Sequence, residues 1–351
     1  MIHVGLDVHH RNSYVRAMDD DGQLYPGQRI YHNDIEALWK YLSQFDGQEK
    51  RVVFEAVANS RWMKRLLAQD PTVVPVAVTP HKVRIIAETV AKTDKIDATV
   101  LATLSRIDAL PVAWLPDEQV EDLRELTRHR AALVCLRTRA KNRVNGVLIR
   151  RGLLRPYGDI FGSLGRSWLG QLKISPVMRL QIDHWLALID HYQKHIDVVE
   201  GKLYRELAKE DRWSKDIALL RTMPGWGKLT ALTVLAELGD YRRFRRRASV
   251  SAFAGLAPSS KRSDRSCRYG KITKHGSTAL RSILVEVSLT GARRVPRYLK
   301  LYNRLKHAKN SNVAKVAIAR QMLEDGWTML IKNEPFRFAP VQAADTLTRV
   351  G

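Results

Sequence analysis

Hydrophobic positions in the first hundred residues fall into short runs that predict a sheet with helices between its strands. Apolar runs at 4–8 and 13–18 predict two strands, and the turn Asp-Asp-Asp-Gly at 19–22 favours a hairpin between them. Further strands are predicted at 52–56 and 73–78, and helical periodicity predicts helices over 34–45 and 60–69. The pattern is typical of an α/β domain.

Two long amphipathic helices are predicted next, after a proline-marked boundary at 112–117. Apolar residues recur at three- and four-residue steps from about 118 to 152, and again from 180 to 207. The stretch between them, 153–176, is rich in glycine, serine and proline and is expected to be irregular. We therefore expect a protruding helical hairpin or coiled coil, whose apolar stripe forms ordinary core or an assembly surface.

A mainly α-helical domain is predicted beyond residue 216. Its helices are expected at 229–238, 277–292, 296–307 and 313–331, with a polar loop at 259–266. A Pro-Gly-Trp-Gly loop precedes the first helix, and such a loop presents backbone N–H groups and a positive helix end to an anion. The predicted domains are thus 1–112, 113–215 and 216–335, followed by a tail at 336–351.

Four carboxylates in the first domain are candidate metal ligands: Asp7, Glu55, Asp94 and Asp97. Asp7 and Glu55 lie in or at the end of predicted strands, and the other two would share one helix face. Four converging carboxylates repel one another unless divalent cations lie between them, and hard oxygen ligands select Mg²⁺ or Mn²⁺. The set therefore predicts a two-metal phosphoryl-transfer site, and the order of elements around it matches an RNase H-like fold.

Composition limits the remaining possibilities. The 351 residues are 45% hydrophobic, which is ample for packed cores. No apolar run approaches the roughly 20 residues that span a bilayer, and the N-terminus has no signal-peptide pattern, so we expect a cytoplasmic protein without membrane contact. Cys135 and Cys267 are too few and too far apart for a disulfide framework or a zinc site.

The charge predicts a polyanionic partner. Lys and Arg number 59 against 36 Asp and Glu, a net charge of +23, and residues 241–281 hold 12 of these cations and one acid. A solvated basic surface without a partner is the alternative. The predicted nucleic-acid contacts are Arg137, Lys141, Arg143, Gly225, Gly227, Lys228, Arg245, Arg246, Lys261, Arg262, Arg265, Arg268, Lys271 and Lys274.

Serines occur among these arginines, at Ser259, Ser260, Ser263 and Ser266. Their hydroxyl groups could bind a phosphate, and they could equally attack it. A serine hydroxyl is a poor nucleophile at neutral pH, so attack would require a metal, a base or strong neutralisation of the phosphate. Both roles therefore remain open from the residues alone.

Several motifs in combination resemble the DEDD insertion-sequence transposases of bacteria, also described as bridge recombinases. They are Gly-Leu-Asp-Val-His at 5–9, Phe-Glu-Ala at 54–56, Lys-Thr-Asp-Lys-Ile-Asp-Ala at 92–98, Met-Pro-Gly-Trp-Gly at 223–227, Ala-Glu-Leu-Gly-Asp at 236–240, Ala-Gly-Leu-Ala-Pro at 254–258 and Gly-Lys-Ile-Thr-Lys-His-Gly at 270–276. The resemblance covers residues 5 to about 331. It implies that Asp7, Glu55, Asp94 and Asp97 are the DEDD acids.

The resemblance further implies a nucleophilic serine at Ser263, with Ser266 as the next candidate. This chain departs from the family in having Asp264 after Ser263, where a small residue is usual. The implied reaction is DNA strand exchange through a phosphoserine intermediate at a Mg²⁺-dependent composite site. The implied partners are a noncoding guide RNA and donor and target DNA, with a homodimer or homotetramer acting at the bacterial nucleoid.

Two other classes of function fit part of the same pattern. A hydrolytic nuclease resembling Holliday-junction resolvases needs only the carboxylates and water, which would leave Ser263 dispensable. A non-catalytic nucleic-acid-binding protein would use the acids structurally and would need no metal. Covalent attachment of DNA to the protein distinguishes the recombinase from both.

Overall fold

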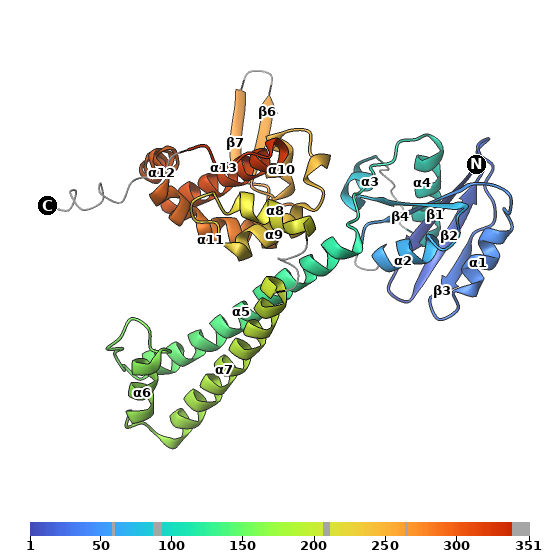
Figure 1. Cartoon of the computed structure of the whole chain (residues 1–351). Coiled ribbons are helices and arrows are strands. Elements are labelled where there is room, and N and C mark those ends of the chain that lie inside the picture. Colours follow the sequence, from blue (N-terminus) through green and yellow to red (C-terminus); the bar gives the residue numbers. More distant parts are fainter. Residues whose placement is uncertain (58–59, 87–92, 206–210, 264–265, 339–351) are drawn as a thin grey trace. The chain divides into compact units, whose positions relative to one another are not determined.

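The computed structural model describes residues 1–57, 60–86, 93–205, 211–263 and 266–338, with only the backbone at 211, 260–263, 266–269 and 271 (Figure 1). The chain divides into two compact units, Met1–Leu115 and Pro116–Gly351. The sequence predicted the first boundary at residue 112, close to the one observed after Leu115. The boundary expected at residue 215, within the second unit, stays a prediction. In the described ranges no helix is both long and apolar enough to cross a bilayer.

The first unit contains a five-stranded mixed sheet. Its strands are β1 (Ile2–Val8), β2 (Asn12–Met18), β3 (Gln28–Tyr31), β4 (Lys50–Glu55) and β5 (Val73–Val78), in the order β3-β2-β1-β4-β5. The pairs β1–β2 and β2–β3 are antiparallel, whereas β1–β4 and β4–β5 are parallel. The predicted α/β, RNase H-like architecture is confirmed, and β3 is a strand that the hydrophobic pattern did not reveal.

Helices cover both faces of this sheet. On one face, the alternate residues Ile2, Val4, Leu6 and Val8 of β1 pack in a core with α1 (Glu36–Ser43) and α2 (Ser60–Leu67). On the other face lie α3 (Pro80–Ile86) and α4 (Asp94–Arg106), which contribute Val83, Leu101 and Leu104 to a second core. The odd-numbered residues of β1 therefore face α4.

Gly5 lets α4 approach β1 directly. A Cβ atom at this position would lie 1.8 Å from the carbonyl oxygen of Ala98 and 2.9 Å from the backbone nitrogen of Ala102. No other residue fits such a contact between two backbones. The glycine thus sets the distance between the strand that carries Asp7 and the helix that carries Asp94 and Asp97.

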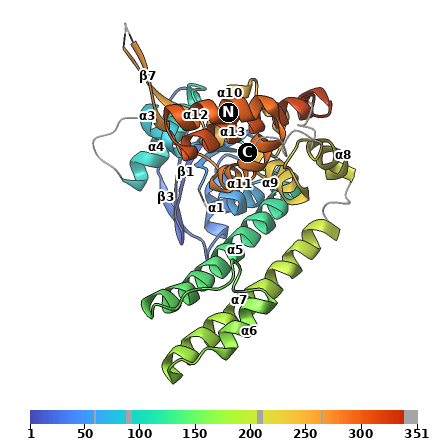
Figure 2. The same ribbon diagram turned by 90° about the vertical axis from the view of Figure 1, so that its left-hand side faces the viewer.

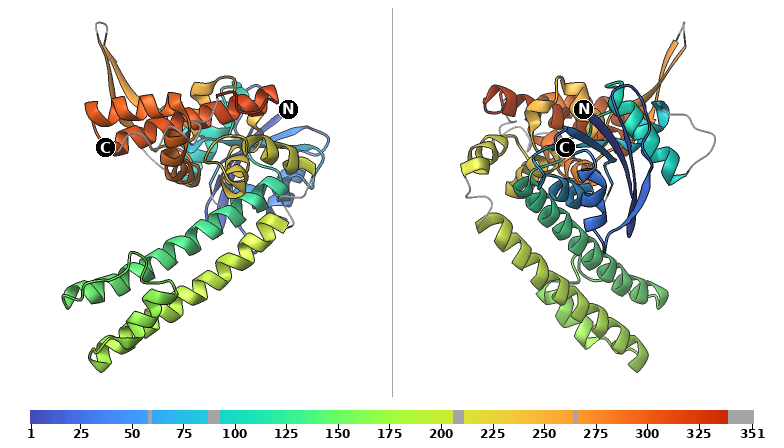
Figure 3. Two further views of the ribbon diagram at one scale, coloured as in Figure 1. Left: turned by 60° about the vertical axis from the view of Figure 1, so that its left-hand side comes forward. Right: turned by 90° about the vertical axis from the view of Figure 1, so that its right-hand side faces the viewer.

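The second unit begins with the two long helices that the sequence predicted. Helices α5 (Glu118–Arg150) and α7 (Pro176–Arg205) pack side by side, as the views in Figure 3 show. Their common core includes Val144, Leu148 and Ile182. The connection was expected to be irregular, but it contains a further helix, α6 (Ser163–Gln171), whose Leu169 is buried in this core.

The remaining helices form a bundle. They are α8 (Asp211–Leu220), α9 (Lys228–Leu238), α10 (Arg247–Phe253), α11 (Thr278–Arg294), α12 (Pro296–Ala308) and α13 (Ser311–Lys332), with a 3₁₀ turn at Tyr241–Arg243. Helix α9 is the central one, because every residue from 230 to 238 is buried. The four helices predicted in this region are confirmed, whereas α8 and α10 were not predicted.

A β-hairpin projects from the bundle (Figure 2). It consists of β6 (Pro258–Ser263) and β7 (Ser266–Ile272), which pair antiparallel. The prediction of a polar loop at 259–266 is therefore wrong. A two-stranded ribbon satisfies its hydrogen bonds between its own strands and does not require a buried apolar face, so its sequence lacks the alternation on which the prediction depended.

Candidate active site

The face of β1 that meets α4 carries polar residues at its start and its end. His3 Nδ1 lies 2.9 Å from Ser105 Oγ near the C-terminus of α4. Asp7, four residues further along the strand, faces the N-terminus of the helix. There, Thr93 caps α4 by accepting a hydrogen bond from the backbone N–H of Ile96 at 3.3 Å. The cap fixes Asp94 and Asp97 in the first helical turn, beside Asp7.

Asp7, Asp94 and the neighbouring His9 form a compact cluster of side chains. His9 Nε2 lies 3.1 Å from Asp7 Oδ2 and 3.2 Å from Asp94 Oδ1. One ligand atom from each of the three residues lies within 4.8 Å of the other two, so together they could hold a metal ion. On the far side of Asp94, the Arg29 guanidinium donates a hydrogen bond of 2.8 Å to Oδ2.

His9 and Arg29 were not among the predicted site residues. His9 follows Asp7 by two positions, which places both side chains on one face of an extended chain, and this spacing was the available signal. Arg29 lies in β3, and no local pattern links it to Asp94, 65 residues further along the chain. It could be recognised only once the sheet order was known.

The environment of Asp7 suits a cation ligand. Its Oδ2 atom is buried and accepts no hydrogen bond from the described residues, since the nearby His9 nitrogen has hydrogen-bond geometry toward Asp94 instead. Burial raises the pKa of Asp7, His9 opposes that rise, and the charges of Asp97 and Asp94 add to it. A divalent cation would relieve both the desolvation and the repulsion, so the residues present fit a metal site.

The two other predicted ligands lie close by. Glu55 ends β4, one residue beyond the paired Leu6 and Phe54, so it occupies the same end of the sheet as Asp7. Asp97 is near enough to Asp7 to raise its pKa. Neither belongs to the three-residue cluster in the described part of the chain. The role of all four acids as metal ligands stays a prediction.

The candidate nucleophile lies at the tip of the β6–β7 hairpin. Ser263 is the last residue of β6 and pairs with Ser266, the first residue of β7. Both candidate serines therefore lie opposite each other in the hairpin, and residues 264–265 between them lie outside the described part of the structure. The side chains of both serines, like those of Lys261, Arg262, Arg268 and Lys271, and the whole of Arg265, lie outside it as well.

The base of the hairpin is fastened by Arg281 of α11. One guanidinium nitrogen donates to the carbonyl oxygens of Ala254 at 3.1 Å and Lys274 at 3.3 Å, residues that precede β6 and follow β7. The two segments are also in close contact at Gly276, where a Cβ atom would lie 2.0 Å from the Phe253 carbonyl oxygen. Gly276 has a φ of +134°, which favours glycine independently.

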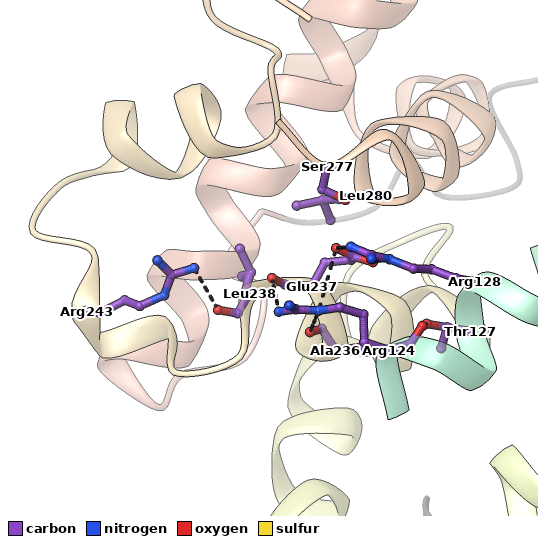
Figure 4. Close-up of polar contacts among 9 residues, drawn as sticks. All are labelled: Arg124, Thr127, Arg128, Ala236, Glu237, Leu238, Arg243, Ser277 and Leu280. Carbon is purple, nitrogen blue, oxygen red and sulfur yellow. Dashed lines mark hydrogen bonds and ion pairs between the residues drawn. The ribbon is translucent and has the colours of Figure 1, made fainter. Parts of the chain in front are cut away.

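Part of the basic face of α5 is structural (Figure 4). Arg128 donates two hydrogen bonds, of 2.7 and 2.9 Å, to the Glu237 carboxylate, which is 1% exposed. Arg124 donates to the carbonyl oxygens of Ala236 at 3.0 Å and Glu237 at 3.1 Å. A cavity of about 880 Å³ adjoins this network, between α5, α9 and α11. These two arginines attach α5 to the bundle, so they are not free to bind a polyanion.

Other predicted nucleic-acid contacts lie on the surface. Arg143, Arg245 and Arg246 are exposed and form no ion pair with any residue that the structure describes. Arg137 donates a hydrogen bond to Gln193, and the Lys141 ammonium lies 4.9 Å from the centroid of a phenylalanine ring. Lys274 is exposed at the base of the hairpin.

The Pro-Gly-Trp-Gly loop is anchored before α9. Gly225 has a φ of +91°, and Gly227 is the N-cap residue, without a side chain to close the helix end. Trp226 between them is buried against Gly326 of α13. The Lys228 ammonium lies 5.9 Å from the centroid of the Tyr204 ring. The loop is thus held to the bundle by Trp226, while the first N–H groups of α9 have no side-chain cap.

Comparisons with known proteins agree on one class. Residues 4–150 match the model of the DEDD transposase domain of the IS110 family, whose description is "Transposase". Residues 217–303 match the model of the "Transposase IS116/IS110/IS902 family". The transposase for insertion sequence element IS1111A of Coxiella burnetii is 27% identical over 261 residues, which cover 70% of this chain and 68% of that protein. The transposase for IS1328 of Yersinia enterocolitica is 23% identical over 81% of this chain and 85% of its own length. The pilin gene-inverting protein of Moraxella bovis is 26% identical over 42% of this chain and 47% of its own length.

Proposed function

Since this chain belongs to the IS116/IS110/IS902 family of transposases, which are DNA-recombining enzymes, we propose that it exchanges DNA strands through a covalent phosphoserine intermediate. We further propose that a noncoding RNA directs this exchange. The two matched regions contain all four candidate acids and the candidate serine. The proposal assigns the acids to a metal site and Ser263 to the attack on DNA.

The observation that carries the proposal is the Asp7, His9 and Asp94 cluster, in which the buried Oδ2 atom of Asp7 accepts no hydrogen bond from the described residues. Asp7 and Asp94 would hold a divalent cation, Mg²⁺ or Mn²⁺, and Glu55 and Asp97 would supply further oxygen ligands. Such a cation, when bound, neutralises phosphate charge and favours the ionised form of a hydroxyl group. His9 would orient the Asp94 carboxylate through its hydrogen bond.

The serine keeps the energy of the phosphodiester bond. Its Oγ atom forms a bond to phosphorus, the bond between phosphorus and the departing sugar oxygen breaks, and the serine proton ends on that oxygen. A hydroxyl group of another strand then attacks the same phosphorus, and the serine recovers its proton as it leaves. Recombination without an external energy source requires such a retained ester, whereas hydrolysis would lose it.

The excess of Lys and Arg over Asp and Glu supports nucleic acids as partners. Donor and target DNA are the substrates that we propose, and the guide RNA would pair with both. A homodimer or homotetramer is the proposed assembly, with α5 and α7 as candidate assembly helices. With donor and target DNA as substrates, the reaction would take place at the nucleoid in the bacterial cytoplasm.

An adduct assay tests the proposal. Protein, guide RNA and labelled DNA with a nick that prevents religation should give a complex that survives SDS. Ser263→Ala should abolish it, whereas Ser259→Ala and Ser260→Ala, nearby in the same strand, should keep it. If the adduct is lost only in Ser266→Ala, the nucleophile is Ser266, on the opposite strand of the hairpin.

The same acid cluster favours one alternative, hydrolysis by metal-activated water. If DNA is cleaved without an adduct in every serine variant, the protein is a nuclease and the phosphoserine mechanism is wrong. If neither cleavage nor an adduct depends on Asp7 or on divalent cations, the metal site is wrong as well.

A further inference from the structure

A groove runs along the contact between α5 and α7, at the half of each helix nearer to α6. It has a volume of about 450 Å³, and its walls include Arg143 and Arg150 from α5 and His184, Trp185 and Leu188 from α7. Arg143 and Arg150 are seven positions apart, and Leu188 follows Trp185 by three positions and His184 by four, so each set lies along one side of its helix. The groove lies within the second unit, in the helical hairpin of Figures 1 and 3.

An aromatic side chain lies in the wall of the groove. Trp185 packs on one side against the hydrophobic core shared by α5, α6 and α7, yet it remains half-buried and lines the groove on the other side. Leu188, one turn further along, is 37% exposed. The core packing holds part of this side chain in place, and an aromatic ring that lines a groove is suited to stacking with a planar group.

The walls carry uncompensated positive charge. Arg143 and Arg150 are exposed and form no ion pair with any residue in the described ranges, and no described acid lines the groove. The chain has no acidic residue from 126 to 158. Asp183 and Asp190 of α7 are already paired, with Arg179 at 3.8 Å and Arg166 at 2.6 Å.

We propose that this groove binds an unpaired base of a single-stranded nucleic acid, stacked on Trp185, with its flanking phosphates on Arg143 and Arg150. Base stacking on an aromatic ring and guanidinium contacts to phosphate are the two recurring elements of single-strand binding. A base in a duplex cannot stack on the ring without leaving its partner. If this groove met the same groove of a second copy, the unpaired arginines of both would oppose each other, so the assembly surface proposed for α5 and α7 would lie elsewhere on these helices. The inference rests on the proposed function only in taking nucleic acid as the ligand.

Binding of three labelled probes to the full-length protein tests the inference. The probes are an unstructured 20-nucleotide oligo(dT), the corresponding oligo(U) and a 20-base-pair duplex, each followed by fluorescence anisotropy. Trp185→Ala should lower single-strand affinity about 5- to 150-fold, as expected for one lost stacking contact, and leave duplex affinity unchanged. Trp185→Phe should retain most of the single-strand affinity. A larger effect on oligo(U) or on oligo(dT) identifies the strand as RNA or DNA.

Trp168 provides a matched control. It is also half-buried and packs against the same core, but it does not line the groove. Equal losses in Trp168→Ala and Trp185→Ala, or an equal loss for duplex and single strand, would show that packing rather than stacking was disturbed and would overturn the proposal. A change of oligomeric state in Trp185→Ala by light scattering would favour a second copy as the occupant. None of these results depends on whether Ser263→Ala abolishes the DNA adduct.

Discussion

Asp7 shows how one strand position combines several requirements of a site. The strand period turns its side chain toward α4, Gly5 brings that helix into backbone contact, and the Thr93 cap fixes Asp94 beside it. The result is a buried carboxylate oxygen that accepts no hydrogen bond from any residue the structure describes. His9 Nε2, 3.1 Å from this oxygen, opposes the rise in the pKa of Asp7 but does not abolish it, so the position should be less stable without a cation than with one.

Asp7→Asn should therefore raise the melting temperature of the metal-free protein. The raised pKa of Asp7 means that its stabilising contribution is present below the unfolded value, near 3.9, and is lost as pH rises through the folded value. The gain from the substitution should be larger at pH 7 than at pH 4. Thermal unfolding at both pH values measures it.

The same variant should lose its response to Mn²⁺ or Mg²⁺. A cation at about 100 times its Kd would stabilise the wild-type protein by about 2.7 kcal/mol, and the variant by much less. Asp34→Asn is the control, because Asp34 is exposed and has no ion pair with a described residue. A lower metal-free melting temperature together with an intact metal response would contradict the assignment of Asp7.

Residue chemistry explains which parts of the site the sequence could predict. Asp7, Asp94 and Glu55 stand at strand ends or in a first helical turn, where local pattern and spacing are informative. His9 was overlooked because a lone histidine in a strand is usually unremarkable, and Arg29 because its contact with Asp94 depends on the pairing of β2 with β3. A contact that depends on the order of strands in the sheet cannot be recognised from a short stretch of sequence.

At the scale of elements, helix capping accounts for four of the helices that were predicted. Helices α4, α5, α11 and α13 begin with a side chain that accepts a hydrogen bond from the first turn, namely Thr93, Asp117, Ser277 and Asn310. Two of the missed helices, α6 and α10, follow the N-cap residues Gly162 and Arg246, which make no such bond. Without a cap and with fewer than ten residues, they offer little periodicity to detect.

The β6–β7 hairpin was missed for a different reason, and its attachment through Arg281 yields a prediction. Arg281→Lys should remove the contacts that join Ala254 and Lys274, since the shorter lysine side chain does not bring its nitrogen to the position of the one guanidinium nitrogen that makes both contacts. Loss of about 1–3 kcal/mol from two hydrogen bonds should speed local amide exchange across 258–272 about 5- to 150-fold. Hydrogen-exchange mass spectrometry measures this directly.

Arg293→Lys is the matched control for the hairpin. Arg293 lies in the last turn of the same helix, is exposed and forms no ion pair with a described residue. Exchange in 258–272 should be unchanged in that variant. If Arg281→Lys leaves hairpin exchange at the wild-type rate, the two carbonyl contacts do not hold the base of the hairpin, and the packing at Gly276 is sufficient.

For the whole molecule, the net charge of +23 is not a measure of binding capacity. Arg124, Arg128 and Arg281 are engaged within the fold, whereas Arg139 and Arg143 are exposed and without ion pairs to described residues. The distinction could not be made from composition, because it depends on which carbonyl or carboxylate each guanidinium reaches after folding.

Duplex binding should be strongly salt-dependent. If six or more phosphates are neutralised, affinity should fall about 10³-fold or more between 50 and 200 mM salt, which anisotropy titrations can measure. Arg139→Gln should reduce the slope of log affinity against log salt by about one, whereas Arg130→Gln, whose guanidinium is paired with Glu200 at 2.7 Å, should change it less. Affinity that hardly varies with salt would contradict a backbone-dominated interface.

The projecting hairpin also bears on how copies of the protein meet in a concentrated solution. Its sheet has only two strands, so each strand has an outer edge without a partner in the described structure. Open strand edges invite pairing with another chain and lead to aggregation, and lysine and arginine along an edge oppose it. The sequence places Lys261, Arg262, Arg268 and Lys271 in these two strands, and we expect their charge to oppose such pairing besides any contact with phosphate. Neutralising all four to probe nucleic-acid binding would risk fibrous or amorphous precipitation, so charge-reversed glutamates would be the safer replacements for preserving colloidal stability.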